Sequence, residues 1–227
     1  MSVSLFGSCR INYVHGSNDL NNLLNYTHST KEVIQLIHFL KGEKNIAEPY
    51  NRLCFRASII FPEKNIVFQE HFRDLFNEST LCVVEICSRK KYIHNEYYLH
   101  HLCVDKRFAE FNKNTPPHIL NEVVVEEQTD EEIVQDITEI ERLIFPKKLV
   151  IVSHYNSKKD GEYMEARNQL IELLEKTCDE KQIPFVNPRK ALHSYDQESI
   201  MTSDLGHYTS FGQSLFNMYL NNFVNRH

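Results

Sequence analysis

Short apolar runs, spaced far apart along the chain, constrain its fold more than any other feature. They occupy residues 2–6, 81–87 ("LCVVEIC"), 148–153 ("KLVIVS") and 183–187 ("IPFVN"). These runs are too short for typical helices and, in the middle of the chain, almost unbroken in apolar character, so they predict strands buried on both faces of a sheet. Strands of that kind are mostly parallel and need a crossover element between them.

Amphipathic helical patterns fill the intervals between these strands. One begins at Ser29 or Thr30 and stops at Gly42, and another follows a capping box formed by Thr129 and Glu132. A third pattern covers residues 163–181. Alternating strands and helices predict an α/β protein, specifically a three-layer α/β/α sandwich with a mostly parallel, flavodoxin-like sheet.

A closing helix is predicted near the end of the chain. Ser210 with Gln213 has the spacing of a second capping box. The inner face of this helix is predicted to hold Phe211, Leu215, Phe216, Tyr219 and Phe223.

The middle of the chain is harder to interpret. Within residues 51–78, "CFRASIIF" is readable as a strand and "QEHFRDLFN" as a helix. Residues 90–120 are rich in Tyr and His and are interpreted as an insertion over the top edge of the sheet. With 227 residues, the chain is expected to form a single domain, 1–227.

Charge and cysteine content narrow the function classes. A net charge of −6 and a pI near 6.1 argue against a nucleic-acid partner, and the one dense basic run, Arg89-Lys90-Lys91, is interpreted as a solvated edge. Six cysteines without a CxxC pair indicate a reducing compartment. Because no signal peptide or run of roughly 18 to 20 apolar residues is present, we expect a cytoplasmic protein without a membrane partner. The oligomeric state is left open.

Small residues with reactive side chains follow the first predicted strand. Gly7 allows a sharp turn, so that Ser8 and Cys9 are presented at the carboxyl end of the strand, where open α/β sheets bind ligands. Taken alone, this stretch also fits a tight strand exit with small buried residues.

A second stretch, "SDLGHYTSFGQ" at 203–213, lies between the last strand and the closing helix. Asp204 is three residues before His207 in a turn that contains glycine, so its carboxylate can orient the imidazole and leave one ring nitrogen free as a base. The same residues also fit an ordinary turn. In a parallel sheet both stretches reach the same edge, which favours an active site.

Together these stretches resemble the SGNH (GDSL-type) hydrolase superfamily, whose first block is a strand with Gly-Asp-Ser and whose last is Asp-x-x-His. "LFGSC" is similar to divergent relatives with Gly-Ser-Cys or Gly-Asn-Cys, several of which are capsule- and polysaccharide-modifying proteins. The resemblance implies that Cys9 takes the place of the nucleophilic serine, with Ser8 as the alternative nucleophile, Asp204 as the orienting acid and His207 as the general base.

The resemblance also implies an enzyme: an acyl-ester hydrolase or O-acyltransferase that acts on a carbohydrate or other small acylated substrate, with acetyl as the favoured group. No cofactor is required, although an acyl donor such as acetyl coenzyme A is compatible. A noncatalytic carbohydrate-binding relative, or another glycan-modifying transferase such as a methyltransferase, are the alternatives. Against methyl transfer stands the absence of a glycine-rich nucleotide loop after any predicted strand.

The family's Gly-x-Asn-Asp block is missing, so the oxyanion donors must be sought elsewhere. Candidates are Ser88, Asn156 and the backbone amide of the nucleophile in the turn at Gly7. Arg10, Arg89 and His154 are candidates to hold an anionic substrate group. No metal is expected, because His94, His100 and His101 lack a recognised ligand spacing with a carboxylate or cysteine partner, and His100-His101 is better explained by surface polarity.

Overall fold

The computed structural model describes residues 2–11, 13–20, 26–61 and 63–227. Its main sheet has four parallel strands in the order β1-β2-β6-β9. Their bounds are β1 Val3–Phe6, β2 Leu81–Ile86, β6 Lys148–Ser153 and β9 Phe185–Val186. All four coincide with strands that the sequence predicts.

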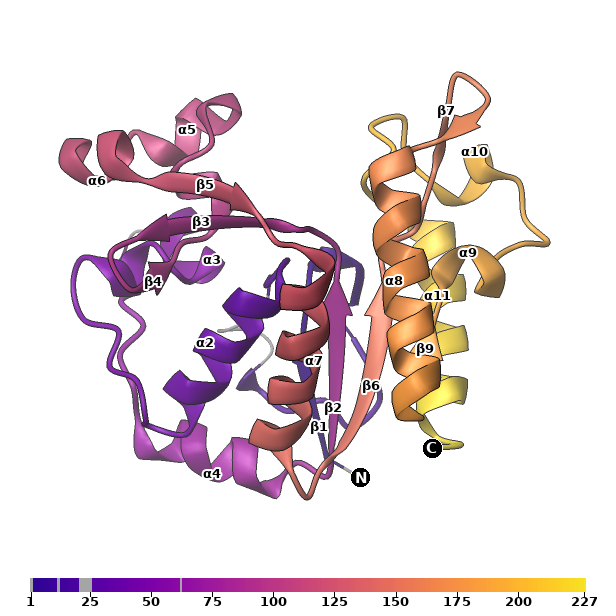
Figure 1. Cartoon of the computed structure of the whole chain (residues 1–227), viewed down its shortest axis with the longest axis horizontal. Coiled ribbons are helices and arrows are strands. Elements are labelled where there is room, and N and C mark those ends of the chain that lie inside the picture. Colours follow the sequence, from indigo (N-terminus) through magenta and orange to yellow (C-terminus); the bar gives the residue numbers. More distant parts are fainter. Residues whose placement is uncertain (1, 12, 21–25, 62) are drawn as a thin grey trace.

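Helices cover both faces of this sheet (Figure 1). One face packs against the crossover helices α2 (Thr30–Leu40), α4 (Glu70–Glu78), α7 (Asp130–Ile144) and α8 (Glu165–Lys181). The other face packs against the closing helix α11 (Ser210–Val224). The predicted α/β/α class is therefore confirmed.

The side-chain alternation of the strands explains the two cores. On β2, Cys82, Val84 and Ile86 face the crossover helices, whereas Leu81 and Val83 face α11. Because every residue of β2 is buried, this strand has the near-continuous apolar sequence of a central parallel strand. Its one charged residue, Glu85, is buried as well.

A second, antiparallel sheet lies at the top of the molecule in Figure 1, beyond the carboxyl ends of β2 and β6. It contains β4-β3-β5, with bounds β3 Lys90–His94, β4 Tyr97–Tyr98 and β5 Val124–Glu127. Residues 90–127 fall where the sequence predicts an insertion. The assignment of the whole chain to a single domain stays a prediction.

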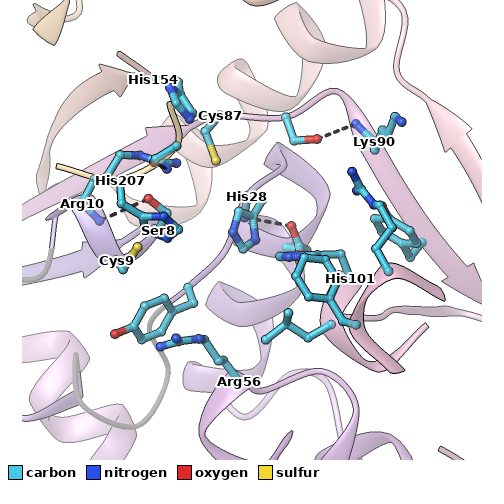
Figure 2. Close-up of a pocket in the computed structure, with 18 of the residues that line it drawn as sticks. Ser8, Cys9, Arg10, His28, Arg56, Cys87, Lys90, His101, His154 and His207 are labelled. Carbon is cyan, nitrogen blue, oxygen red and sulfur yellow. Dashed lines mark hydrogen bonds between the residues drawn. The ribbon is translucent and has the colours of Figure 1, made fainter. Parts of the chain in front are cut away.

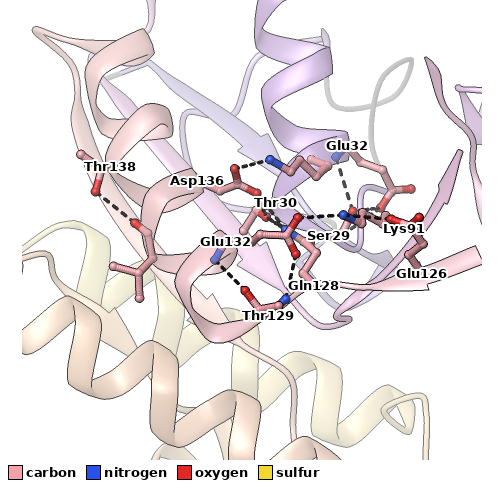
Figure 3. Close-up of polar contacts among 12 residues, drawn as sticks. Ser29, Thr30, Glu32, Lys91, Glu126, Gln128, Thr129, Glu132, Asp136 and Thr138 are labelled. Atoms are coloured by element: carbon pink, nitrogen blue, oxygen red, sulfur yellow. Dashed lines mark hydrogen bonds and ion pairs between the residues drawn. The ribbon is translucent and has the colours of Figure 1, made fainter. Parts of the chain in front are cut away.

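Polar contacts join α2 to α7 across the first core (Figure 3). The Thr30 hydroxyl donates to Asp136 at 2.6 Å, and the Lys31 ammonium pairs with the same carboxylate at 2.7 Å. Both helices begin with a capping box, Ser29 with Glu32 in α2 and Thr129 with Glu132 in α7. The box predicted for α7 is thus confirmed.

Two local predictions are wrong. Residues Arg56–Ile60 form a short helix, α3, rather than a strand. Helix α11 is capped by Thr209, whose hydroxyl accepts the Gly212 N–H, so Ser210 already lies inside the helix. The buried face is shifted accordingly and consists of Gly212, Phe216, Leu220 and Val224, while Phe211 is 50% exposed.

The remaining elements are short. They are the 3₁₀ helices η1 (Cys9–Ile11), η2 (Tyr50–Arg52), η3 (His101–Cys103) and η4 (Lys106–Phe108), the helices α5 (Ala109–Asn112), α6 (Pro117–Glu122), α9 (Pro188–Ala191) and α10 (Gln197–Ile200), and the hairpin β7 (Lys158–Lys159) with β8 (Glu162–Tyr163). Among the described residues, no helix has the length and apolar character needed to cross a membrane.

Candidate active site

A cavity of about 460 Å³ opens at the carboxyl edge of the main sheet. Its walls come from the turn after β1, helix α3, the 90–127 segment, the start of α8 and the loop before α11. Figure 2 shows Cys9 and His207, from opposite ends of the chain, on the same side of this cavity. The cavity therefore joins the two stretches that the sequence singles out.

The turn after β1 depends on a close backbone approach at Gly7. A Cβ atom at this position would lie 2.6 Å from the Cβ of Glu85, so only glycine fits between the two strands. The next residue, Ser8, is 1% exposed, and its hydroxyl donates to Glu85 at 2.5 Å. Because Ser8 is buried, its hydroxyl is less accessible to a substrate than the partly exposed Cys9 thiol.

Cys9 is partly exposed and lines the cavity. Burial raises the pKa of its thiol, and the nearby Arg10 guanidinium opposes this increase. The Cys9 backbone N–H interacts with the sulfur of the same residue, which also favours the thiolate. The thiol thus combines access to the cavity with a backbone amide beside it.

His207 is oriented by Asp204, as the sequence predicts. Its Nδ1 lies 2.6 Å from Asp204 Oδ2, and because the carboxylate can only accept, Nδ1 carries the proton and Nε2 is free. The hydrogen bond from Thr202, with those from the Gly206 and His207 N–H groups, holds the pKa of Asp204 well below its usual range. Asp204 is therefore ionised throughout the neutral pH range.

Behind these groups lies a buried ion pair that the sequence analysis missed. Arg10 Nε donates to Glu85 Oε1 at 2.9 Å, and Arg10 Nη1 donates to the Gly206 carbonyl at 2.7 Å. The signal in the sequence is the lone carboxylate inside an otherwise apolar strand, because buried charges are rare unless they are paired.

The other predicted residues are divided between the cavity and its surroundings. Ser88 lines the cavity, with its hydroxyl oxygen accepting the Lys90 N–H. Asn156 is fully buried, does not line the cavity, and donates to the Met164 carbonyl. Arg89 also lies outside, where it pairs with Asp130 at 2.6 Å. An oxyanion role for Asn156 and an anion-binding role for Arg89 do not fit these positions.

His154 lines the cavity but is not a cation. Its Nδ1 donates to the Tyr155 carbonyl, and burial lowers the pKa of the ring well below its usual value. A neutral ring whose only proton is already donated has no N–H left for an anionic group, so this geometry does not favour the anion-binding role, which stays a prediction for His154.

Cationic side chains face the cavity from several elements. Arg56 stacks on the Tyr26 ring at 3.7 Å, Arg167 donates to the Leu205 carbonyl at 3.0 Å, and Lys90 lines the wall near Ser88. Among the described residues, no carboxylate forms an ion pair with any of these three cations. These three side chains, called the cationic wall below, are better placed for an anion than Arg10 and Arg89, which the sequence analysis suggested.

Three histidines gather beside Arg56, and their ring nitrogens lie within 4.8 Å of one another: His28, His100 and His101. His100 is buried rather than a surface residue, which corrects the interpretation above. Its Nδ1 accepts the Leu102 N–H, so in the neutral ring Nε2 carries the proton and has no lone pair for a metal. Burial lowers the pKa of all three rings and so keeps them neutral. It is the proton on His100 Nε2, with the positive charge of Arg56 nearby, that makes this donor set unsuited to a divalent ion.

The α/β/α fold places Cys9 and His207 in one cavity at the carboxyl edge of its parallel sheet, with Asp204 bonded to His207, which is the arrangement implied by the resemblance of the two sequence blocks to SGNH-type proteins. More specifically, the chain belongs to the family described as the TviD N-terminal domain, whose model matches residues 1–118 and 112–222.

Known structures and proteins add a limited comparison. The crystal structure of the lipase/acylhydrolase from Enterococcus faecalis is similar over 100% of this chain and 96% of that one, with 8% sequence identity and a TM-score of 0.46. No curated protein matches the chain in sequence.

Proposed function

We propose that this protein is an acyl-ester hydrolase or O-acyltransferase that acts on a carbohydrate through a covalent acyl-enzyme on Cys9. The observation that carries the proposal is that Cys9 and His207 line one cavity, with His207 held by Asp204 at 2.6 Å. The carbohydrate and the acetyl group rest on the resemblance of the Gly7-Ser8-Cys9 block to polysaccharide-modifying relatives.

The reaction takes place in two steps. In the first step His207 Nε2 removes the thiol proton as Cys9 Sγ bonds to the ester carbonyl carbon, and the proton then passes to the departing alkoxide oxygen as the C–O bond breaks. In the second step water or a sugar hydroxyl gives its proton to His207 and attacks the thioester, and the proton returns to the sulfur. An acyl coenzyme A thioester is a compatible donor for the first step.

The accessibility of the two side chains supports the choice of Cys9 over Ser8. The Ser8 hydroxyl donates a hydrogen bond to Glu85, whereas the Cys9 thiol is partly exposed in the cavity. The backbone N–H of Cys9 is the first candidate for an oxyanion donor, since a nucleophile's own amide lies close to the carbonyl it attacks. The second donor is left open, with Ser88 and Arg167 as cavity-lining candidates.

The cationic wall supports a substrate that carries an anionic group. Arg56 and Lys90 face the cavity without carboxylate partners among the described residues, so a carboxylate or phosphate on the substrate could pair with Arg56.

Hydrolysis of a small acetyl ester tests the proposal. We expect Cys9→Ala and His207→Ala to lose about 10³-fold or more in turnover, while Ser8→Ala retains measurable activity. Cys54→Ala and His193→Ala, which change the same residue types away from the cavity, serve as matched controls. Equal rates in wild type, Cys9→Ala and His207→Ala would disprove the triad, and loss in Ser8→Ala alone would make Ser8 the nucleophile.

The two alternatives predict other results. A carbohydrate-binding protein would bind a glycan equally well in wild type and Cys9→Ala, with no ester turnover in either. A methyltransferase would show a thermal shift with a nucleotide-type methyl donor and none with acyl donors.

A further inference from the structure

A buried ion pair lies directly behind the reactive groups. Arg10 and Glu85 are 7% and 1% exposed, so the two charges are buried, unlike those of a surface ion pair. Burying two charges is often no more stabilising than burying a matched apolar pair, so stability alone gives little reason to keep them here.

The hydrogen bonds of this pair reach both reactive residues. Glu85 Oε2 accepts the N–H of Ser8 at 2.7 Å as well as its hydroxyl, which fixes the residue before Cys9. Arg10 Nη1 donates to the carbonyl of Gly206, which is the residue before His207. A continuous set of buried bonds therefore connects the nucleophile turn, strand β2 and the histidine loop.

The pair also sets the charge around the sulfur. The groups near Cys9 are Arg10 on η1, Glu85 on β2 with Cys87 just after it, Arg56 on α3, and His207, which lines the same side of the cavity. Arg10 and Arg56 favour the thiolate, whereas burial and Glu85 disfavour it, and the net effect raises the pKa of Cys9. Burial is the main cause of the raised pKa, and Glu85 opposes the effect of Arg10.

We propose that Arg10 and Glu85 are positioning residues that hold the Cys9 turn and the His207 loop in one geometry, and that their mutual neutralisation keeps Cys9 a thiol until His207 removes its proton. The catalytic consequence rests on the function proposed above, but the effect on the thiol does not. The alternative is a preformed thiolate–imidazolium pair, which an uncompensated arginine beside the sulfur would favour.

The test is the pH dependence of Cys9 alkylation by iodoacetamide, resolved by peptide mass spectrometry from the other five cysteines. Glu85→Gln leaves the Arg10 charge unpaired and is expected to lower the midpoint by about one pH unit, whereas Arg10→Gln leaves the carboxylate and is expected to raise it. The double variant is expected to return the midpoint close to that of wild type. Structural damage would not move the two single variants in opposite directions, so shifts of the same sign, or none, would overturn the proposal.

A conservative variant separates charge from geometry. Arg10→Lys keeps the charge but cannot bond Glu85 and Gly206 together, so the midpoint should stay near wild type while ester turnover falls about tenfold or more. If Arg10→Gln does not fold, the other two variants still test the proposal. A raised alkylation midpoint in Glu85→Gln, or full ester turnover in Arg10→Lys, would contradict it.

An exposed arginine–glutamate pair gives the matched control. Arg142 and Glu139 pair on the surface of α7, and Arg142→Gln and Glu139→Gln should change neither midpoint nor turnover. Opposite midpoint shifts without any ester turnover in wild type would support the positioning pair and count against the proposed function, so the two failures can be told apart.

Discussion

Both carboxylate oxygens of Asp204 accept hydrogen bonds. Oδ1 accepts from the Thr202 hydroxyl and the N–H groups of Gly206 and His207, and Oδ2 accepts from the His207 ring. The residue shapes its own loop and selects the histidine tautomer at the same time. Because it is about half exposed, these bonds contribute more to orientation than to global stability.

Asp204→Asn tests this division. The amide is similar in shape, but it can stabilise the tautomer with the proton on Nε2, which removes the base, so turnover should fall by about 10² to 10⁴. The melting temperature should change little, as measured by calorimetry on the same samples. A variant that keeps full turnover would show that Asp204 does not orient His207.

The placement of Cys9 and His207 in one cavity could be predicted from sequence because each of the two motifs is defined by short spacing. Gly7-Ser8-Cys9 follows a strand, and Asp204 and His207 share one turn. Glu85 and Arg56 could not be assigned in the same way. Their roles depend on which strand lies next to β1 and on how α3 folds against the cavity, and neither relation is local in the sequence.

Helix α2 carries a partly buried carboxyl group, that of Glu32, at its amino end. Glu32 Oε2 accepts the N–H groups of His28 and Ser29 at 2.8 Å each, as the acid of the capping box. Burial raises the pKa of Glu32 to about 7 despite these bonds. In the folded state Glu32 therefore binds a proton more tightly than in the unfolded chain.

This difference makes the contribution of Glu32 to stability depend on pH. Between the unfolded pKa of about 4.3 and the folded pKa near 7, the folded state binds more protons, so this contribution falls as pH rises. Glu32→Gln cannot ionise, and relative to wild type it should gain about 2 kcal/mol in free energy of unfolding between pH 5 and pH 8. Denaturant titrations at both pH values measure this, and a constant difference would contradict the raised pKa.

The elements differ in how far sequence pattern determines them. The start of α7 could be predicted from sequence because the capping residues and the apolar stripe of the helix both indicate the same first residue. At α11 two adjacent hydroxyl residues, Thr209 and Ser210, both suit a cap, and aromatic residues on both sides of the helix obscure the buried face. The α3 segment is apolar and short, and its helical form follows from packing rather than from periodicity.

At the scale of the whole molecule, the parallel sheet brings the two ends of the chain to one edge, and the 90–127 segment adds part of the cavity wall. This segment contributes Lys90, Tyr92, Arg107 and Phe108, so it combines cationic and aromatic surface opposite the Cys9 turn. The overall α/β/α arrangement could be predicted because strand and helix patterns alternate. The antiparallel sheet could not, because its strands are short and partly exposed.

Arg56→Gln tests the use of that cationic wall. For an acetylated sugar that carries a carboxylate, we expect KM to rise about tenfold, since the variant loses a charge-assisted hydrogen bond. For the matched sugar without the carboxylate, KM should change much less. Arg142→Gln is the surface control, and equal effects on both sugars would assign Arg56 a structural role.

The identity of the residue that carries the acyl group tests the central claim most directly. Wild-type protein mixed with saturating acetyl ester and acid-quenched within the first turnover should carry one acetyl group, located by peptide mass spectrometry on Cys9. The same treatment should leave Cys9→Ala unlabelled. An acetyl group on Ser8 or on any other residue of the wild-type protein, or undiminished ester turnover by Cys9→Ala, would contradict the account.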